Sequence, residues 1–271
     1  MRPIRRLTHR VARRAAARVP PRVREVAFAL AARAADGPAL LPGPPPGPVL
    51  VLAPHPDDES IGPGGALARH AEAGDHVTVL VASSGERTRG GVGDVRSTRE
   101  AECRAACAVL GAGEPVFLRL PDGALGDRVP ELAAALRAYG PGAQTVYAPS
   151  VLDPHRDHRA ANAALAAAGL PAEVFGYEVW SPAPVDVVLD VGAFYDRKER
   201  ALRCYATGLA SVDYVRAARG LAAYRSVAGG LGGAGLAEGF VRLTAAEHAA
   251  FCARAGLGIS PPGPVDGEPR R

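Results

Sequence analysis

Short runs rich in Val and Leu alternate with Ala-rich segments along most of the chain. The apolar runs are VLVLAP (49–54), HVTVLVASSG (76–85), PVFLRLP (115–121), TVYAPS (145–150), EVFGYEVW (173–180) and VDVVLDV (185–191). Between them, the spacing of apolar positions predicts helices over 64–74, 95–111, 130–139 and 158–168. Strands that are apolar at nearly every position are typical of a parallel sheet covered on both faces. We therefore expect an α/β fold, a Rossmann-like three-layer sandwich with a mostly parallel central sheet.

Proline and glycine divide the chain into its expected parts. The stretch DGPALLPGPPPGP at 36–48 cannot continue a helix, so we expect the folded domain to begin near Val49. Residues 194–244 predict a long helical region, a Gly-rich loop and the short strand FVRL, and we expect the end SPPGPVDGEPRR to be disordered. The expected division is an Arg-rich N-terminal extension (1–36), a Pro/Gly linker (37–48), one domain (49–250) and a C-terminal tail (251–271).

Positive charge is concentrated at the N-terminus. The formal net charge is +4, but residues 1–36 hold ten Arg against Glu25 and Asp36, a balance of +8 that leaves residues 37–271 at −4. Two interpretations fit this segment: a solvated, partly helical extension, or one that contacts an anionic membrane surface weakly. We expect no nucleic-acid partner.

The remaining composition is that of an ordinary globular protein, with 48% hydrophobic and 22% charged residues. No apolar stretch reaches the roughly 18 residues of a membrane span, and Arg33 interrupts the N-terminal apolar run that a secretory signal would need. We therefore expect a cytoplasmic protein, at most peripheral to a membrane. The four cysteines form no CxxC, and Cys103 and Cys107 lie four apart on a predicted helix, so we expect reduced, structural thiols.

Two polar clusters follow predicted strands directly. His55, Asp57, Asp58 and Glu59 come after VLVLAP, and the segment DPHRDH (153–158) comes after TVYAPS. Groups that prefer water are costly at the end of a buried strand unless something there uses them. Because ligands bind beyond the carboxyl ends of the strands in such sheets, we expect the two clusters to meet at one edge and to form a metal site.

The residue types in these clusters predict a catalytic metal site. Such a site commonly uses three imidazole or carboxylate ligands and keeps one position open for water. His55 and Asp58 can reach one ion together, and His158 can supply the third ligand. Asp57 is then left beside the metal as a general base, and His155 can polarise a carbonyl, stabilise an oxyanion or protonate a leaving amine. Zn²⁺ is the expected ion, although two imidazoles and one carboxylate also suit Fe²⁺.

The segments APHPDDESIGPGG and DPHRDHRAA together resemble the PIG-L/LmbE-like deacetylase family, whose pattern is (A/P)HPDD(E/D) followed far downstream by HPDH. Weaker similarities are SSGE after the second strand, the Arg99-Glu100 helix, LPDG around Asp122, YEVW at 177–180 and a late helical stretch ending in AEGF. The resemblance covers about 49–244. It implies a zinc enzyme that removes acetyl from N-acetylglucosamine units in phosphatidylinositol glycolipids, in mycothiol biosynthesis or in some antibiotics.

The resemblance also implies roles for individual residues. The zinc ligands are the same as those expected above: His55, Asp58 and His158. It implies that Asp57 is the general base, that His155 faces the carbonyl oxygen and that Asp157 orients the His155 imidazole. By weaker analogy, Arg99 and Asp122 contact substrate hydroxyls.

Three residues of the second motif depart from related patterns, and one residue of the first motif has two interpretations. Arg156 stands where the family usually has proline, which leaves the ligands in place and either changes the rigidity of the loop or adds a cation near the substrate. Asp153 and Pro154 differ from the mycothiol deacetylase pattern, in which a tyrosine precedes the second motif by a residue. Glu59 either holds the loop by accepting hydrogen bonds behind the metal ligands or simply begins a helix.

Other interpretations remain open for several of these residues. Helix capping explains one aspartate of the first cluster but not the set. Arg99 also fits a solvated helix face, Asp122 a turn, and Tyr177 and Trp180 either a sugar platform or the core.

The prediction is a zinc-dependent N-deacetylase acting on an amino sugar or an amino-sugar-containing molecule. The alternatives are an amidase for a thiol conjugate or another secondary-metabolite amide and a metal-stabilised sugar- or lipid-binding module, whereas a nucleotide-binding oxidoreductase lacks its glycine fingerprint. The Ala/Arg/Gly-rich composition is typical of high-GC bacteria.

Overall fold

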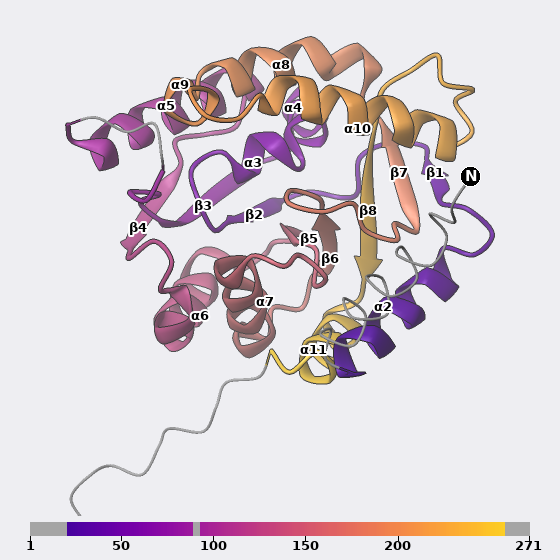
Figure 1. Ribbon diagram of the computed structural model, residues 1–271, viewed down its shortest axis with the longest axis horizontal. Coiled ribbons are helices and arrows are strands. Elements are labelled where there is room, and N and C mark those ends of the chain that lie inside the picture. The colour runs from indigo at the N-terminus through magenta and orange to yellow at the C-terminus, as the bar shows by residue number, and fades with distance from the viewer. Residues whose placement is uncertain (1–20, 89–92, 258–271) are drawn as a thin grey trace, which may run out of the picture.

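A central eight-stranded sheet organises the molecule (Figure 1), as seen in a computed structural model that describes residues 21–88 and 93–257. The strand order is β1-β7-β8-β6-β5-β2-β3-β4. All neighbouring pairs are parallel except β6·β8 and β7·β8. The strands are β1 (Ala39–Leu41), β2 (Val49–Ala53), β3 (Val77–Ser83), β4 (Val116–Leu120), β5 (Thr145–Pro149), β6 (Glu173–Tyr177), β7 (Val187–Asp190) and β8 (Ala237–Leu243).

Helices cover both faces of this sheet (Figure 1). One layer contains α3 (Asp58–Ile61), α4 (Gly64–Ala73), α5 (Val95–Leu110), α8 (Tyr195–Arg203), α9 (Ala206–Leu209) and α10 (Tyr214–Ala228). The other contains α2 (Pro21–Arg33), α6 (Val129–Tyr139), α7 (Arg156–Ala168) and α11 (Ala245–Arg254), with the short 3-10 helix η1 (Leu125–Arg128) before α6. The predicted α/β three-layer architecture with a mostly parallel sheet is confirmed.

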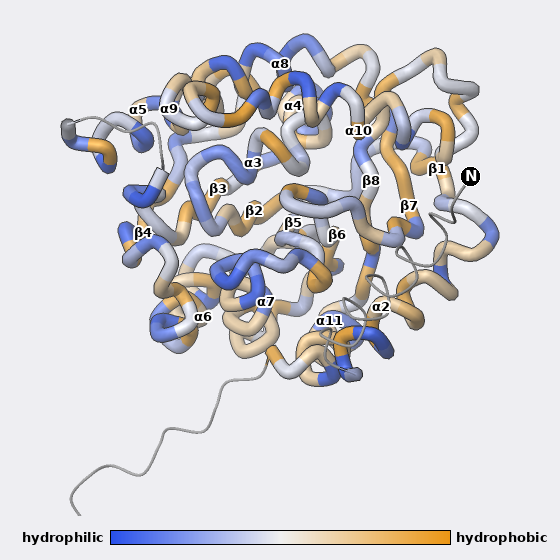
Figure 2. The backbone as a smooth tube through the Cα atoms, viewed as in Figure 1, coloured by the Kyte–Doolittle hydropathy of each residue, from blue (hydrophilic) through white to orange (hydrophobic). Residues whose placement is uncertain are grey.

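The core lies on both sides of the sheet because each strand sends alternate side chains to opposite faces. Leu50 and Leu52 of β2 join the cluster under α6, α7 and α11, whereas Val49 and Val51 join the cluster under α4, α5 and α8. Every residue of β2 is buried, which explains why the strand reads as a continuous apolar run rather than an alternating one. Figure 2 shows the same distribution: hydrophobic colour follows the central strands, and the outer helix α8 is mostly hydrophilic.

The packed structure begins earlier than the expected domain start at Val49. Helix α2 buries Val26 and Leu30 completely against the core and packs on α11, and Arg33 at its end pairs with Asp186 at 3.1 Å and Glu247 at 2.8 Å. Two apolar positions four residues apart form a helical stripe that the surrounding arginines obscure in the sequence.

The expected linker and tail also contribute structure. Strand β1, within the predicted linker, pairs with β7 in parallel, and α11 runs past residue 250 with Phe251 and Cys252 buried. Segments 1–20 and 258–271, which include most of the Arg-rich extension and the predicted disordered end, lie outside the described residues. No helix within 21–88 and 93–257 combines the length and the apolar character that crossing a membrane requires.

The four cysteines are free thiols, as the sequence predicted, and three of them are buried: Cys103, Cys107 and Cys252. Cys252 lies beside His248 on α11. The His248 ring is 2% exposed, and its Nε2 lies 2.8 Å from Oδ1 of Asn162 on α7. Asn162 in turn donates from Nδ2 to the carbonyl oxygens of Pro149 and His158, which ties α11 to the carboxyl end of β5.

This buried histidine makes folding depend on pH. Burial lowers the pKa of His248 from 6.5 to about 4. Between these values the unfolded chain binds a proton that the folded chain does not, so this contribution is complete above pH 6.5 and is lost as pH falls towards 4. From pH 7.5 to pH 5 we expect His248 to account for about 2 kcal/mol of lost unfolding free energy, measured by urea titration against His248→Gln. Equal losses in both proteins would contradict this assignment.

Candidate metal centre

The two polar clusters meet at one edge of the sheet. Strands β2 and β5 are parallel neighbours, so the loop that leads from β2 to α3 lies beside the loop that leads from β5 to α7 (Figure 1). The first loop and the start of α3 carry His55, Asp57 and Asp58, and the second loop with the first turn of α7 carries His155 and His158. The expected encounter of the two clusters therefore occurs.

Asp58 contacts both of the other expected metal ligands. Oδ2 of Asp58 lies 3.1 Å from Nδ1 of His55 and 3.2 Å from Nε2 of His158. Atoms about 2.0 Å from a tetrahedral zinc ion lie about 3.3 Å from one another, so these two spacings suit a shared ion. His158 is fully buried, and each of its ring nitrogens lies 3.2 Å from a carboxylate oxygen, Nε2 from Asp58 and Nδ1 from Asp153. A buried imidazole between two carboxylates suits a metal ligand that is oriented from behind.

The charges around Asp58 favour the binding of a cation. Burial alone would raise the pKa of Asp58, but the charges and hydrogen bonds of His158 and His55 hold it well below its usual range. Burial opposes protonation of His158, whereas Asp58 and Asp153 raise its pKa to about 9. The centre therefore holds an ionised carboxylate between two imidazoles, whose protons a divalent ion would displace.

A second carboxylate lies behind each imidazole. Asp157 Oδ2 is 3.2 Å from Nε2 of His55, and Asp153 Oδ2 is 3.2 Å from Nδ1 of His158. Carboxylates in this position fix the orientation of a metal-binding imidazole and raise its basicity. From the sequence, Asp153 was noted only because it differs from the mycothiol deacetylase pattern. Its position in the loop after β5, five residues before His158, could have identified it as a partner of that imidazole.

Asp157 has a different contact from the one expected. Its carboxylate accepts hydrogen bonds from the backbone N–H groups of Gly123 and Leu125 at 2.6 and 3.2 Å, besides contacting His55. Only its backbone N–H reaches Nδ1 of His155, at 3.3 Å. In the structure the Asp157 carboxylate contacts the His55 ring rather than the His155 ring. The N–H groups of the turn after β4 hold the carboxylate in this position.

His155 lies at the opening of the centre. Its ring centroid is 4.8 Å from those of both His55 and His158, and its ring stacks on Trp180 with centroids 6.0 Å apart and planes 14° apart. Burial and the two neighbouring imidazoles lower the pKa of His155, which favours the neutral ring. Ligand atoms of His55, His155 and His158 lie within 4.8 Å of one another, so this ring is also within reach of an ion.

Asp57 is held in a conformation that few residues adopt. Its φ is 124°, a left-handed value that costs about 1–3 kcal/mol and persists only where the surroundings enforce it. Its N–H donates to Glu59 at 3.1 Å, and its Oδ2 accepts from Nη2 of Arg99 at 2.9 Å. Burial raises the pKa of Asp57 to about 6; Arg99 opposes that rise and Asp58 adds to it. A carboxylate with this pKa beside a metal site is suited to accept a proton near neutral pH.

Arg99 is not on a solvated helix face. Its side chain is 4% exposed, and its guanidinium donates to the carbonyl oxygen of Pro56 as well as to Asp57. A Cβ on Gly85, whose φ is +62°, would lie 2.6 Å from Nε of Arg99, so the close approach of this loop requires glycine. Arg99 therefore braces the loop that carries the expected base, while also lining the cleft.

Glu59 holds the same loop from below. It is fully buried and accepts hydrogen bonds from the hydroxyl groups of Ser60 and Tyr205 and from the N–H of Asp57. The structure thus gives it contacts behind the metal ligands, in line with the first of the two interpretations of this residue. Tyr205 was missed by the sequence reasoning, because its loop between α8 and α9 is distant in the chain from the first cluster.

The centre opens into a cleft of about 540 Å³ that both polar and apolar side chains line. Asp122 serves both as a turn residue, accepting from the N–H of Arg87 at 2.9 Å, and as a neighbour of His55, 3.4 Å from its Nε2. Arg156 is exposed and lines the rim. Trp180 lines the cleft with 51% of its surface exposed, whereas Tyr177 is wholly buried and belongs to the core.

Comparison with known proteins places these residues in context. The PIG-L family model, described as GlcNAc-PI de-N-acetylase, matches residues 50–169. A 1D-myo-inositol 2-acetamido-2-deoxy-alpha-D-glucopyranoside deacetylase from Kineococcus radiotolerans is 39% identical over 88 residues, which cover 28% of this chain and 23% of that protein. The chain therefore spans less than a quarter of the length of that curated relative.

Two solved structures are similar over almost their whole length. A conserved protein from Thermus thermophilus gives a TM-score of 0.62 at 32% identity and covers 71% of this chain and 93% of its own. The 4-carboxy-2-hydroxymuconate hydratase from Pseudomonas putida gives a TM-score of 0.58 at 27% identity and covers 72% of this chain and 95% of its own.

The carboxylate behind His158 offers a test of the centre. We expect Asp153→Asn to weaken zinc binding by roughly 10- to 100-fold, because the imidazole loses the partner that orients it and raises its basicity. Competition with a chromogenic zinc chelator measures this affinity directly. Asp127→Asn, which changes an exposed aspartate of η1, is the matched control and should bind zinc like the wild type. Unchanged affinity in Asp153→Asn would exclude this role.

Proposed function

Because the chain belongs to the PIG-L (LmbE-like) family, we propose that it is a zinc-dependent hydrolase that removes an N-acyl group, acetyl above all, from an amino sugar or an amino-sugar-containing small molecule. The observation that carries the proposal is the shared oxygen of Asp58 between the imidazoles of His55 and His158, with Asp57 directly beside it. This arrangement supplies a metal site and a base at the floor of one cleft.

His55, Asp58 and His158 would hold the ion. Zinc at such a site polarises a carbonyl oxygen and lowers the pKa of water, and iron(II) suits the same ligands. Asp157 and Asp153 keep the two imidazoles in the orientation that leaves one nitrogen of each for the ion.

Asp57 takes the proton from the attacking water. Its carboxylate is next to Asp58 in sequence, and the ion pair with Arg99 fixes its position on the cleft wall. As the water oxygen adds to the amide carbon, this proton moves to Oδ1 or Oδ2 of Asp57. When the carbon–nitrogen bond breaks, a proton from Asp57 or from His155 goes to the departing amine, so that the products are a carboxylic acid and a free amine.

His155 acts from the open side of the cleft. Its Nδ1 accepts the N–H of Asp157, which leaves Nε2 to donate to the oxygen on which negative charge develops. The stacked Trp180 holds the imidazole plane, and its own exposed face can receive a sugar ring. On the rim, Arg156 supplies a cation and Asp122 a hydrogen-bond acceptor for the other substituents of the sugar.

Two other reactions would use the same centre. An amidase for a thiol conjugate needs the same ligands and base, and differs only in the groups that line the rim. A hydratase is favoured as an alternative by the 27% identity to the Pseudomonas putida enzyme, since water addition to a double bond also needs a base beside a metal. Release of a free amine distinguishes both deacylations from hydration.

The base and a metal ligand have separable roles. With N-acetylglucosamine and related N-acetyl sugars as substrates, we expect Asp57→Asn to keep about one zinc per chain while kcat falls about 100-fold to 10,000-fold, because only proton transfer is lost. His158→Ala should lose both zinc and activity. Metal analysis of the purified protein and a fluorogenic assay for primary amines measure the two quantities.

A histidine outside the clusters provides the control. His76 is exposed, and His76→Ala should retain zinc and activity. Tight zinc binding by the wild type without amine release from any N-acyl sugar would refute the deacylase proposal and leave the metal site standing. Absence of bound metal in the wild type would refute both.

A further inference from the structure

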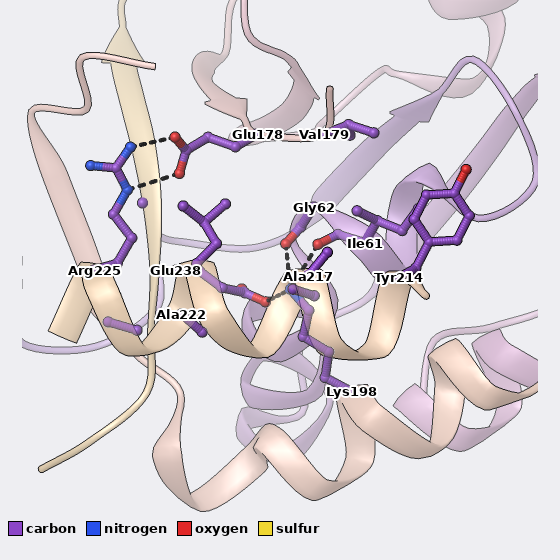
Figure 3. A pocket seen from close by; sticks show the side chains of 14 residues that line it. Ile61, Gly62, Glu178, Val179, Lys198, Tyr214, Ala217, Ala222, Arg225 and Glu238 are labelled. Carbon is purple, nitrogen blue, oxygen red and sulfur yellow. Dashed lines mark hydrogen bonds and ion pairs between the residues drawn. The ribbon is translucent and has the colours of Figure 1, made fainter. Parts of the chain in front are cut away.

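A second, smaller cavity lies behind the catalytic cleft. It has a volume of about 90 Å³ and lies between α10, the end of α3 and strand β8 (Figure 3). One face of α10 forms a wall of the cavity. The alanines on this face, Ala217, Ala218 and Ala222, are small and leave space that larger side chains would fill. Ile61 and Gly62 form the opposite wall.

This cavity adjoins the catalytic cleft. Ile61, Val179 and Tyr214 line both spaces, and Ile61 belongs to the same short helix as Asp58. A Cβ on Gly208 would lie 3.4 Å from the Tyr214 ring and 3.7 Å from the Asp57 carboxylate, so Tyr214 and the expected base flank the same glycine. The small cavity therefore begins close to Asp57, where Ile61, Val179 and Tyr214 line both spaces.

The charged groups on the cavity wall are already paired. Lys198 Nζ donates to Glu238 at 2.6 Å and to the carbonyl oxygens of Ile61 and Gly62 at 2.8 and 2.9 Å. Arg225 forms a two-bond ion pair with Glu178 at the far end (Figure 3). Because these charges satisfy one another, the cavity has nothing to recruit a charged ligand and offers mainly methyl and methylene groups to an apolar one.

We propose that this cavity receives the outer carbons of the substrate's acyl group, so that the enzyme accepts linear N-acyl chains longer than acetyl. The inference rests on the proposed deacylase function. When the amide carbonyl faces the metal centre, the sugar is directed to the rim that carries Arg156 and Asp122, and the acyl chain passes between Ile61 and Tyr214.

The size of the cavity sets the chain length. A water-sized or methylene-sized group takes roughly 30 Å³, so a cavity of about 90 Å³ holds about three of them. Butanoyl, with three carbons beyond the carbonyl, fits this space. The Arg225–Glu178 pair closes the far end, so an octanoyl chain does not fit.

The test compares N-acetyl-, N-butanoyl- and N-octanoyl-glucosamine by amine release. In the wild type, two more buried methylenes correspond to about a tenfold higher kcat/KM for butanoyl than for acetyl, and octanoyl should be at least tenfold poorer than butanoyl. Ala218→Leu fills the cavity and should abolish the tenfold preference for butanoyl while acetyl is still cleaved. Ala223→Leu, the same change on the exposed side of α10, is the matched control and should keep the wild-type profile.

The outcomes separate this inference from the proposed function. Cleavage of acetyl with a steep loss for butanoyl in the wild type overturns the acyl subsite and leaves the deacylase intact. An undiminished preference for butanoyl in Ala218→Leu, or a kcat/KM that still rises at octanoyl, likewise overturns it. No amine from any of the three overturns the deacylase proposal itself. If Ala218→Leu does not fold, the wild-type chain-length profile alone decides the matter.

Discussion

The contact on which the site depends is that of one buried carboxylate oxygen with two imidazoles. Asp58 is 1% exposed, and a carboxylate in that position is costly unless charged or hydrogen-bonding partners surround it. His55 and His158 meet that need on one side, and each is held from behind by another carboxylate, Asp157 or Asp153. Removing any one member leaves a buried charge without its partner, so the group is stable only as a unit.

The surrounding fold fixes this unit through long-range pairs rather than through the loops themselves. Lys198 on α8 binds the last carbonyl groups around α3, and its partner Glu238 on β8 accepts two N–H groups at 2.7 and 2.8 Å from the start of α4. One ion pair therefore sets where α3 ends and where α4 begins. On the other side of the sheet, Asn162 joins α7 to β5 and to His248 on α11. These pairs connect the catalytic loops to elements contributed by the last third of the chain.

The sequence predicts the sheet, most helices and the meeting of the two clusters, because each depends on a local pattern and on the rule that parallel strands share a carboxyl edge. It does not predict which carboxylate turns towards which ring: Asp157 is two residues from His155, yet its side chain contacts His55. Nor does it predict that Arg99 is buried, since a helix position with a charged residue looks solvated until the loop at Gly85 is seen to cover it. In both cases the deciding contact joins segments that are distant in the chain.

The division of the site between two parts of the chain bears on how its specificity arises. Every proposed metal ligand and the proposed base lie within residues 50–169, the segment that matches the family model. The walls around Trp180 and Tyr214, and the walls of the small cavity other than Ile61 and Gly62, come from later segments that this match does not include. A deacetylase relative shares 39% identity over a short stretch, whereas a hydratase shares 27% over nearly all of its length. The matched segment thus holds the proposed ligands, the proposed base and part of the cleft lining, and the later segments supply the other walls of the cleft.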